Sequence, residues 1–346
     1  MQSTIRTDGF IVRARSYELM LQPSLRKESI MATKKQKIGW IGAGRMGFEM
    51  ALRLAKGGCD ITVWNRTRAK AEPLAQYGAK IADKASELAG CDLVFCMVST
   101  YADVKEVIAG KGGLLSRDTK AAKGKRAAPR ILVECSSISL EGSAELRQIL
   151  AGHGTKMLAA PVSGNAKVIK AGKLSFVCSG PRAVFDEALP LMKLIAPAVS
   201  YVGEGELARI VKICHNVFLG VVIQSLCEIT ILAQKAGVPR HAFLDFINQS
   251  VMGSVFSRYK TPALVNLDFK VTFTPTLLRK DLDLGLDAGR KFEVPLPLAS
   301  ITRDLIQSMM GEGMAEQDFA TLLLRQAHSS GIELKPENVA VGDGLA

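Results

Sequence analysis

Three glycines near the start of the chain, Gly42, Gly44 and Gly47, have the G-x-G-x-x-G spacing that can bind a dinucleotide. The first allows a tight turn, the second lets the backbone approach a pyrophosphate, and the third lets a helix pack closely on a strand. Residues 37–41 are short and apolar, as in a buried parallel strand, and residues 48–54 carry apolar side chains at helical spacing. This context predicts a pyrophosphate site at the helix N-terminus, because free backbone amides there attract an anion. An ordinary tight turn is the alternative.

The end of the second predicted strand bears on which dinucleotide binds. Asn65, Arg66 and Thr67 stand where NAD-binding proteins usually have an Asp or Glu that holds the ribose hydroxyls. A carboxylate would repel a 2′-phosphate, whereas a guanidinium can form a bidentate contact with it. The sequence therefore predicts NADP(H) as the preferred cofactor, with Arg66 as its main contact and NAD(H) as the second choice. The alternative is that Arg66 and Arg68 are solvated surface side chains.

The formal net charge of +12 is concentrated in two segments. Residues 1–36 carry seven Lys or Arg and three Asp or Glu, and residues 111–130 carry seven basic residues and one acidic residue. Such runs are typical of solvated segments, so we expect no nucleic-acid partner. No apolar run approaches the ~18 residues of a membrane span, and no His or Cys spacing fits a metal site, so we expect neither a membrane nor a metal.

The cysteines and the N-terminus bear on the compartment. The seven cysteines form no C-x-x-C pair, and several lie in apolar, strand-like runs, which is typical of a reducing compartment. The first 30 residues lack the apolar core of a secretory signal and mix basic with acidic residues. We therefore expect a cytoplasmic protein with a disordered extension over residues 1–34, and Met31 is a candidate for the natural start.

Alternating strand and helix patterns over residues 35–203 predict an α/β domain, an N-terminal Rossmann fold with a doubly wound, mostly parallel sheet. After the glycine unit, strands are expected at 80–81, 92–98, 130–135, 157–160, 174–179 and 198–202. Helices are expected at 69–77, just before residue 88, and at 101–108, 140–152 and 182–195.

The pattern changes after residue 205, where about 30 residues show helical spacing without a proline. A helix over 206–236 would be ~45 Å long, enough to join two domains. Further helices are expected at 240–250, 275–290, 296–311 and 316–328. The sequence thus predicts a C-terminal all-α domain over 204–332, joined to the Rossmann domain by a long interdomain helix, and a frayed tail over 333–346.

Four separated motifs appear in one order: IGAGRMG with WNRT, then ECSSIS, APVSGNAKVIKAGKLSF and KICHN. As a set, over residues 37–330, they resemble the β-hydroxyacid dehydrogenase family, which includes 3-hydroxyisobutyrate dehydrogenase and the glyoxylate/succinic semialdehyde and tartronate semialdehyde reductases. The resemblance implies hydride transfer between a nicotinamide cofactor and a small carboxylate substrate. 6-Phosphogluconate dehydrogenase is a more distant relative with a longer helical domain.

The resemblance implies that Lys212 and Asn216 are catalytic, because the family has a lysine and an asparagine at this spacing on its interdomain helix. Residues i and i+4 share one helix face. An ammonium there can protonate a substrate carbonyl oxygen during reduction and accept the proton during oxidation. Asn216 would donate to the same oxygen or help to hold the lysine. The alternative is an exposed helical lysine with a polar neighbour.

The resemblance also implies a substrate loop at residues 159–165. Ser163 and the backbone amides of Gly164 and Asn165 would bind a carboxylate, since hydroxyl and amide donors suit an anion. The chain departs from the family here, because Ala159 replaces an aspartate and Asn165 stands where many members have glycine. A plain tight turn is the alternative.

The remaining family positions surround the cofactor. Ser137 corresponds to a residue beside the nicotinamide, Met97 and Val98 would line the adenosine or ribose side, and Lys280 would reach the cofactor from the helical domain. Packing at a strand end and a solvated lysine paired with Asp281 are the alternatives. The predicted cofactor residues are Gly42, Gly44, Arg45, Met46, Gly47, Asn65, Arg66, Thr67, Met97, Val98, Ser137 and Lys280.

A second departure precedes the predicted catalytic lysine, where Glu206 and Ala208 replace two family glycines. Either Glu206 or Arg209 could therefore reach the cleft, and an arginine near Lys212 would lower its pKa.

The sequence favours an NADP-preferring dehydrogenase of the 3-hydroxyisobutyrate dehydrogenase type, with a glyoxylate/succinic semialdehyde or tartronate semialdehyde reductase as the alternative. A hypothesis from a different functional class is that the protein is a non-catalytic module that binds a dinucleotide. The predicted partners are a small carboxylate substrate and a second copy of the chain, as a homodimer or homotetramer.

Overall fold

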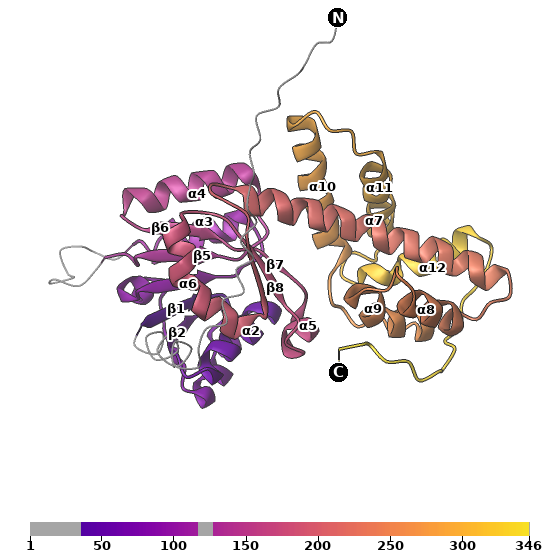
Figure 1. Ribbon diagram of the computed structural model, residues 1–346, viewed down its shortest axis with the longest axis horizontal. Helices are drawn as coiled ribbons and strands as arrows, with labels where there is room; N and C mark the ends of the chain where they lie inside the picture. Colours follow the sequence, from indigo (N-terminus) through magenta and orange to yellow (C-terminus); the bar gives the residue numbers. More distant parts are fainter. Residues whose placement is uncertain (1–35, 117–126, 346) are drawn as a thin grey trace, which may run out of the picture.

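The computed structural model describes residues 36–116 and 127–345 and shows two regions joined by one long helix (Figure 1). The predicted N-terminal extension over 1–34 lies outside the described residues, as does the middle of the basic run over 111–130. The strands all precede residue 202, and only helices and connecting segments follow it.

The first region is built on a six-stranded sheet in which every neighbouring pair is parallel. The strand order is β3-β2-β1-β4-β5-β6, which reverses direction at β1 as a doubly wound sheet does. The strands are β1 Lys37–Ile41, β2 Asp60–Trp64, β3 Lys80–Ile81, β4 Leu93–Cys96, β5 Ile131–Glu134 and β6 Lys156–Ala159. The predicted Rossmann fold is confirmed.

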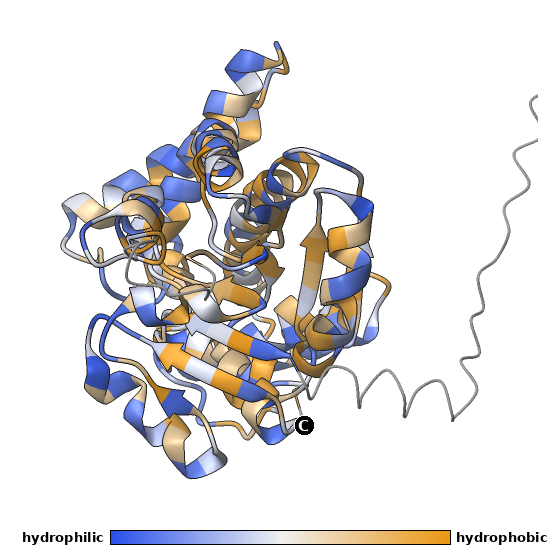
Figure 2. Cartoon of the chain, turned by 90° about the vertical axis from the view of Figure 1, so that its left-hand side faces the viewer, coloured by the Kyte–Doolittle hydropathy of each residue, from blue (hydrophilic) through white to orange (hydrophobic). Residues whose placement is uncertain are grey.

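Helices cover both faces of this sheet, which explains why its strands are nearly continuous apolar runs. The helices α2 (Arg45–Lys56) and α6 (Arg182–Ile195) pack on one face, and α3 (Tyr101–Ala109) and α4 (Leu140–Gly152) pack on the other. Figure 2 shows hydrophobic residues along the strands and alternating hydrophilic and hydrophobic residues on the helices around them.

The predicted helix over 69–77 consists of two 3₁₀ helices, η1 (Arg68–Lys70) and η2 (Glu72–Tyr77), and the helix expected before residue 88 is a third, η3 (Ala85–Gly90). Each of these helices is short. Pro73, at the start of η2, has no backbone N–H and so cannot donate a hydrogen bond that would continue a longer helix through this point.

A separate three-stranded sheet follows the main one. Its strands are β7 (Val162–Ser163), β8 (Ser175–Cys178) and β9 (Ala198–Tyr201), and β7 is antiparallel to β8. The strands expected at 174–179 and 198–202 are present in this second sheet, and a bridge between Ser179, just after β8, and Ala159 of β6 joins it to the main sheet. Between β7 and β8 lies a short helix, α5 (Ala166–Lys170), so the predicted substrate loop is a hairpin that carries a helix.

Helix α7 (Leu207–Lys235) runs from the sheet region into the helical region (Figure 1). Length and composition would allow it to cross a membrane. However, residues along its length are buried, and it packs against α10, α11 and α12, as the core helix of a globular domain does. It therefore acts as the central support of the second region.

The other helices enclose one apolar core around α7. They are α8 (Arg240–Gln249), α9 (Val255–Asn266), α10 (Pro275–Lys291), α11 (Pro297–Gly311), η4 (Phe319–Thr321) and α12 (Leu322–Ser329). The pattern did not predict α9, because Pro262 lies inside it and a proline usually ends or kinks a helix. The Ser254 side chain caps its start by accepting a hydrogen bond from the Ser257 amide.

The expected frayed tail over 333–346 differs from the structure, which holds residues 333–345 against the helices. The Glu337 carboxylate accepts hydrogen bonds from the backbone amides of Arg240 and His241 at 2.7 and 2.9 Å, where α8 begins. Asn266 exchanges hydrogen bonds with the backbone of Val339. The tail is ordered because it caps helix ends, which apolar periodicity does not reveal.

Candidate active site

The glycine turn has the shape that a pyrophosphate requires. A Cβ at Gly42, whose φ is 96°, would lie 2.2 Å from the Met97 carbonyl oxygen, and one at Gly47 would lie 2.0 Å from the Gly42 carbonyl oxygen. In contrast, Gly44 has nothing within 4 Å of its Cβ position. It precedes α2 without a side-chain cap, so the first amides of the helix face an open cradle. The residues present therefore fit a dinucleotide phosphate.

Asn65 ties this turn to the end of β2. Its Oδ1 accepts a hydrogen bond from the Ala43 amide and its Nδ2 donates to the Thr67 carbonyl oxygen, both at 2.8 Å. The Asn65 side chain therefore positions the turn, whereas Arg66 extends into solvent with 84% of its side chain exposed, 3.5 Å from Asp103. Arg68 pairs instead with Glu72 and Asp83.

The other predicted cofactor residues lie around the same edge of the sheet. The Met97 amide donates to the Ile41 carbonyl oxygen, and the Val98 amide donates to the Ser136 hydroxyl, so the two residues after β4 flank the glycine turn. Met46 is half-buried on α2. The exposed Arg45 lies with its Nη1 3.4 Å from the Val271 carbonyl oxygen, which belongs to the helical region.

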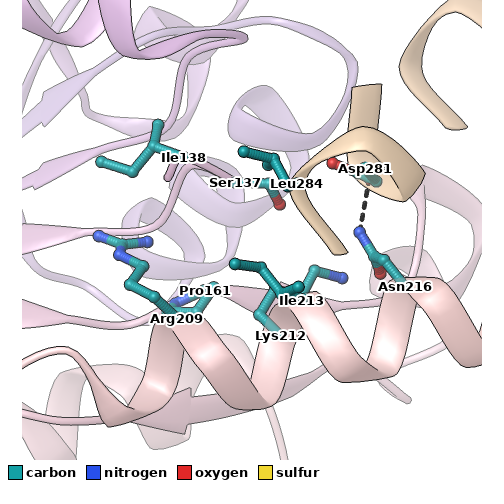
Figure 3. A pocket seen from close by; sticks show the side chains of 9 residues that line it. All are labelled: Ser137, Ile138, Pro161, Arg209, Lys212, Ile213, Asn216, Asp281 and Leu284. Carbon is teal, nitrogen blue, oxygen red and sulfur yellow. Dashed lines mark hydrogen bonds between the residues drawn. The ribbon is translucent and has the colours of Figure 1, made fainter. Parts of the chain in front are cut away.

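Lys212 lies in a small pocket between the two regions (Figure 3). The walls are formed by Ser137, Ile138, Pro161, Arg209, Lys212, Ile213, Asn216, Asp281 and Leu284. Burial lowers the pKa of Lys212 to about 8, Lys280 adds to this shift, and Asp281 opposes it. The side chain can therefore gain or lose a proton near neutral pH, as a general acid or base must.

Asn216 lies on the same face of α7 and is held in a fixed orientation. Its Nδ2 donates to Asp281 Oδ2 on α10 at 2.6 Å (Figure 3). Lys280 Nζ lies 3.1 Å from Asp281 Oδ1 and donates to the Ser137 carbonyl oxygen at 2.9 Å. The predicted residues Lys212, Asn216, Ser137 and Lys280 are thus brought together at one point.

Ser163 joins this group through His215, a residue that no sequence argument had singled out. The Ser163 hydroxyl lies 2.8 Å from His215 Nε2, and His215 Nδ1 lies 2.9 Å from Asn216 Oδ1. Asp281 had been noted only as a partner of Lys280. Both residues stand inside motifs of the sequence, KICHN and KDL, but only the three-dimensional contacts reveal their partners.

Gly164 and Asn165 lie beside Ser163 and not in the wall of the Lys212 pocket. Gly164 has a φ of 136°, and a Cβ there would lie 2.8 Å from the Val168 side chain, so the turn requires glycine. The Asn165 side chain accepts a hydrogen bond from the Val168 amide at 3.1 Å and caps α5. The same side chain also hydrogen-bonds Tyr259 of α9, so it is engaged by the protein itself.

Glu206 and Arg209, the two residues that were candidates to reach the cleft, have separate partners. Arg209 is buried and forms an ion pair with Glu134, and its guanidinium also donates to the Ser136 carbonyl oxygen at 2.6 Å. Glu206 accepts hydrogen bonds from Arg147 and Ser143. Arg209 thus reaches the pocket wall, but the expectation that it lowers the pKa of Lys212 is wrong. Burial and Lys280 cause that shift, while the charge of Arg209 is compensated by Glu134.

Among residues 36–116 and 127–345, no group of three or more His, Cys, Asp or Glu side chains could hold a metal ion.

Comparison with known proteins shows which proteins the chain is similar to. Residues 37–203 match the family model described as the NAD binding domain of 6-phosphogluconate dehydrogenase, and residues 206–325 match the model described as NAD-binding of NADP-dependent 3-hydroxyisobutyrate dehydrogenase. The chain is 28% identical to glyoxylate/succinic semialdehyde reductase 2 of Arabidopsis thaliana over 287 residues, which cover 83% of this chain and 78% of that protein.

Two further similar proteins are a nuclear factor and a dehydrogenase of known structure. The chain is 28% identical to the Homo sapiens cytokine-like nuclear factor N-PAC, over 87% of this chain and 53% of that protein. A solved structure of 3-hydroxyisobutyrate dehydrogenase from Salmonella typhimurium superposes with a TM-score of 0.73 at 25% identity, and covers 83% of this chain and 99% of that chain.

Proposed function

The chain belongs to the β-hydroxyacid dehydrogenase family, and on that premise we propose that it interconverts a small hydroxyacid and its semialdehyde or oxo acid with NADP(H). The observation that supports this proposal is Lys212, a lysine whose pKa is about 8, beside the fixed amide of Asn216. The pair lies in the cleft between the dinucleotide-binding region and the helical region.

A dinucleotide held at the turn of Gly42, Gly44 and Gly47 would supply the hydride for the carbonyl carbon of the substrate. Lys212 in its ammonium form donates a hydrogen bond to the carbonyl oxygen and transfers a proton to it as negative charge develops there. In the opposite direction the neutral amine accepts the proton of the substrate hydroxyl. Asp281 orients the Asn216 amide and, by its negative charge, favours the ammonium form of Lys212.

The substrate carboxylate is assigned to the hairpin around Ser163. A serine hydroxyl and the backbone amides of Gly164 and Asn165 are neutral donors that suit an anion. The similarity to a glyoxylate/succinic semialdehyde reductase makes these two aldehydes the first alternatives to a substrate of the 3-hydroxyisobutyrate type.

The proposed preference for NADP(H) over NAD(H) rests on Arg66. Its side chain is 84% exposed at the end of β2, and position 65, where NAD-binding proteins usually have a carboxylate, is an asparagine. Asp103 lies 3.5 Å from Arg66, and an exposed pair of this kind is weak enough to be replaced by a phosphate.

The proposal is tested by following NADPH oxidation with glyoxylate, succinic semialdehyde, methylmalonate semialdehyde and tartronate semialdehyde. Turnover of at least one of them supports a reductase. Tight binding of NADPH without turnover of any would instead favour a non-catalytic dinucleotide-binding module, a reading to which the similarity to a nuclear factor lends weight.

A further inference from the structure

Four side chains form a continuous hydrogen-bonded chain across the cleft. Ser163 Oγ lies 2.8 Å from His215 Nε2, His215 Nδ1 lies 2.9 Å from Asn216 Oδ1, and Asn216 Nδ2 lies 2.6 Å from Asp281 Oδ2. This series of hydrogen bonds begins at Ser163, in the hairpin assigned to the substrate carboxylate, and ends at Asp281 on α10. Ser163 and Asp281 belong to different regions of the fold, so His215 and Asn216 on α7 connect them.

The chemistry of the groups fixes the position of each hydrogen along this chain. An ionised carboxylate only accepts, so Asp281 requires the amide nitrogen of Asn216 to face it. The amide oxygen of Asn216 then faces His215 and also only accepts, so His215 Nδ1 carries a hydrogen. In a neutral imidazole the other nitrogen has a lone pair. Nε2 therefore accepts the hydroxyl hydrogen of Ser163.

This arrangement decides what Ser163 can offer to a ligand. While His215 is neutral, the single hydrogen of the Ser163 hydroxyl points to Nε2, and only lone pairs remain for the cleft. A carboxylate also presents lone pairs, so Ser163 is then a poor partner for it. When His215 is protonated, Nε2–H donates to Ser163 Oγ, and the serine hydrogen is released to donate to a carboxylate.

We propose that His215 is a specificity-determining residue of the substrate subsite. Its protonation state sets whether Ser163 presents a hydrogen or a lone pair, and a carboxylate binds more tightly when His215 is protonated. This inference rests on the proposed function, which assigns the substrate carboxylate to Ser163.

The charged groups around His215 place the transition below neutral pH. Burial lowers the pKa of His215 from 6.5 and the positive charge of Lys212, one turn earlier on α7, lowers it further, whereas Asn216 and the carboxylate of Asp281 raise it. Lys280 forms an ion pair with Asp281, at 3.1 Å from its Oδ1. From α9, Tyr259 reaches Asn165 of the hairpin and carries no charge in this range, because burial raises the pKa of its hydroxyl. The transition is thus separate from that of Lys212, whose pKa is about 8.

The direct test measures binding of oxalate, an unreactive carboxylate, to the protein saturated with NADP⁺, by calorimetry between pH 5 and pH 7.5. Oxalate remains doubly ionised across this range. We expect the Kd of the wild-type protein for oxalate to rise roughly tenfold as His215 loses its proton, because the hydrogen bond from Ser163 to the charged carboxylate is then lost. The uncharged analogue oxamide should show no such rise.

Two variants separate the proposed mechanism from simple charge attraction. In His215→Gln the residue no longer titrates, so the Kd for oxalate should not change with pH in this range. In Ser163→Ala the imidazolium charge remains but the switchable hydroxyl is lost, so most of the rise should disappear. A rise that persists in full in either variant would overturn the proposal. His153→Gln, at the end of α4, is the matched control and should behave as the wild type.

The outcomes also separate this inference from the proposed function. Turnover of an aldehyde together with oxalate binding that does not depend on pH would reject the role of His215 and leave the reductase intact. A complete failure of oxalate to bind at any pH, with NADP⁺ binding retained, would reject the carboxylate subsite at Ser163 and the inference with it. Retained NADP⁺ binding also shows that each variant is folded.

Discussion

The Asn216 amide donates a 2.6 Å hydrogen bond to Asp281, and this contact joins α7 to α10 beside Lys212. The negative charge of Asp281 raises the pKa of Lys212, against the effect of burial.

In Asp281→Asn the amide oxygen can still accept a hydrogen bond from Asn216, but the negative charge is gone. The pKa of Lys212 should then fall below about 8. Consequently, reductase activity should be lost at lower pH than in the wild type. The comparison is a pair of kcat–pH profiles. Asp283→Asn, which removes a surface partner of Arg303, should leave the profile unchanged.

Lys212→Ala tests the proposed proton donor. The substitution should lower kcat at least ~100-fold, because general acid–base catalysis typically contributes this much. NADPH affinity, measured by fluorescence titration, should remain close to that of the wild type. Lys235→Ala near the end of the same helix is the control and should keep full activity. A Lys212→Ala enzyme within a few-fold of the wild type would exclude the assigned role.

The pH dependence of the two directions should be opposite. Reduction requires the ammonium form of Lys212, which is present below the pKa of about 8, so the reduction rate should fall as pH rises through this value. Oxidation requires the free amine, so its rate should rise over the same interval. Initial rates of both directions across pH 6 to 10 would check this, and parallel profiles would contradict it.

Arg66→Ala tests the preference for NADP(H). Loss of a charge-assisted contact with the 2′-phosphate should raise the KM for NADPH by roughly 10-fold or more, while the KM for NADH stays unchanged. Arg68→Ala is the matched control, because Arg68 pairs with Asp83 and Glu72. An equal effect on both cofactors would argue against a phosphate contact at Arg66.

Gly44→Ala should separate folding from cofactor binding. The Cβ would enter space that is empty within 4 Å, and the φ of −71° suits alanine, so the Tm should stay within a few degrees of the wild type. Dinucleotide affinity should nevertheless fall sharply, because the methyl group occupies the pyrophosphate cradle. Gly152→Ala, where the added Cβ also meets nothing, should affect neither property.

Those parts of the fold and site that depend on neighbours in the sequence could be predicted. The glycine turn is encoded within six residues, and Lys212 and Asn216 share a helix face because of their spacing alone. The assignment of β8 and β9 to a second sheet depends on which strands meet in space, and alternation of apolar residues carries no such information.

The unpredicted site residues are those whose partners are distant in the sequence. Asp281 contacts Asn216 across 65 positions, and His215 contacts Ser163 across 52. Arg209 illustrates the same limit, since its charge could be identified from the sequence but its neutralisation by Glu134 could not. Similarly, the tail was expected to fray because the acceptors at the start of α8 are not adjacent to it in the chain.

The ordered tail also changes how the two regions are connected mechanically. Lys173, in the hairpin after Ser163, donates a 2.9 Å hydrogen bond to the carbonyl oxygen of Gly344. This contact joins the tail to the sheet region, in addition to the contacts that Lys280 and Arg45 make between the two regions. A hinge motion that separates the two regions about the start of α7 must therefore break the Lys173–Gly344 hydrogen bond as well. A bulky protein fused to the C-terminus would therefore disturb the hairpin that carries Ser163, because Gly344 is hydrogen-bonded to Lys173.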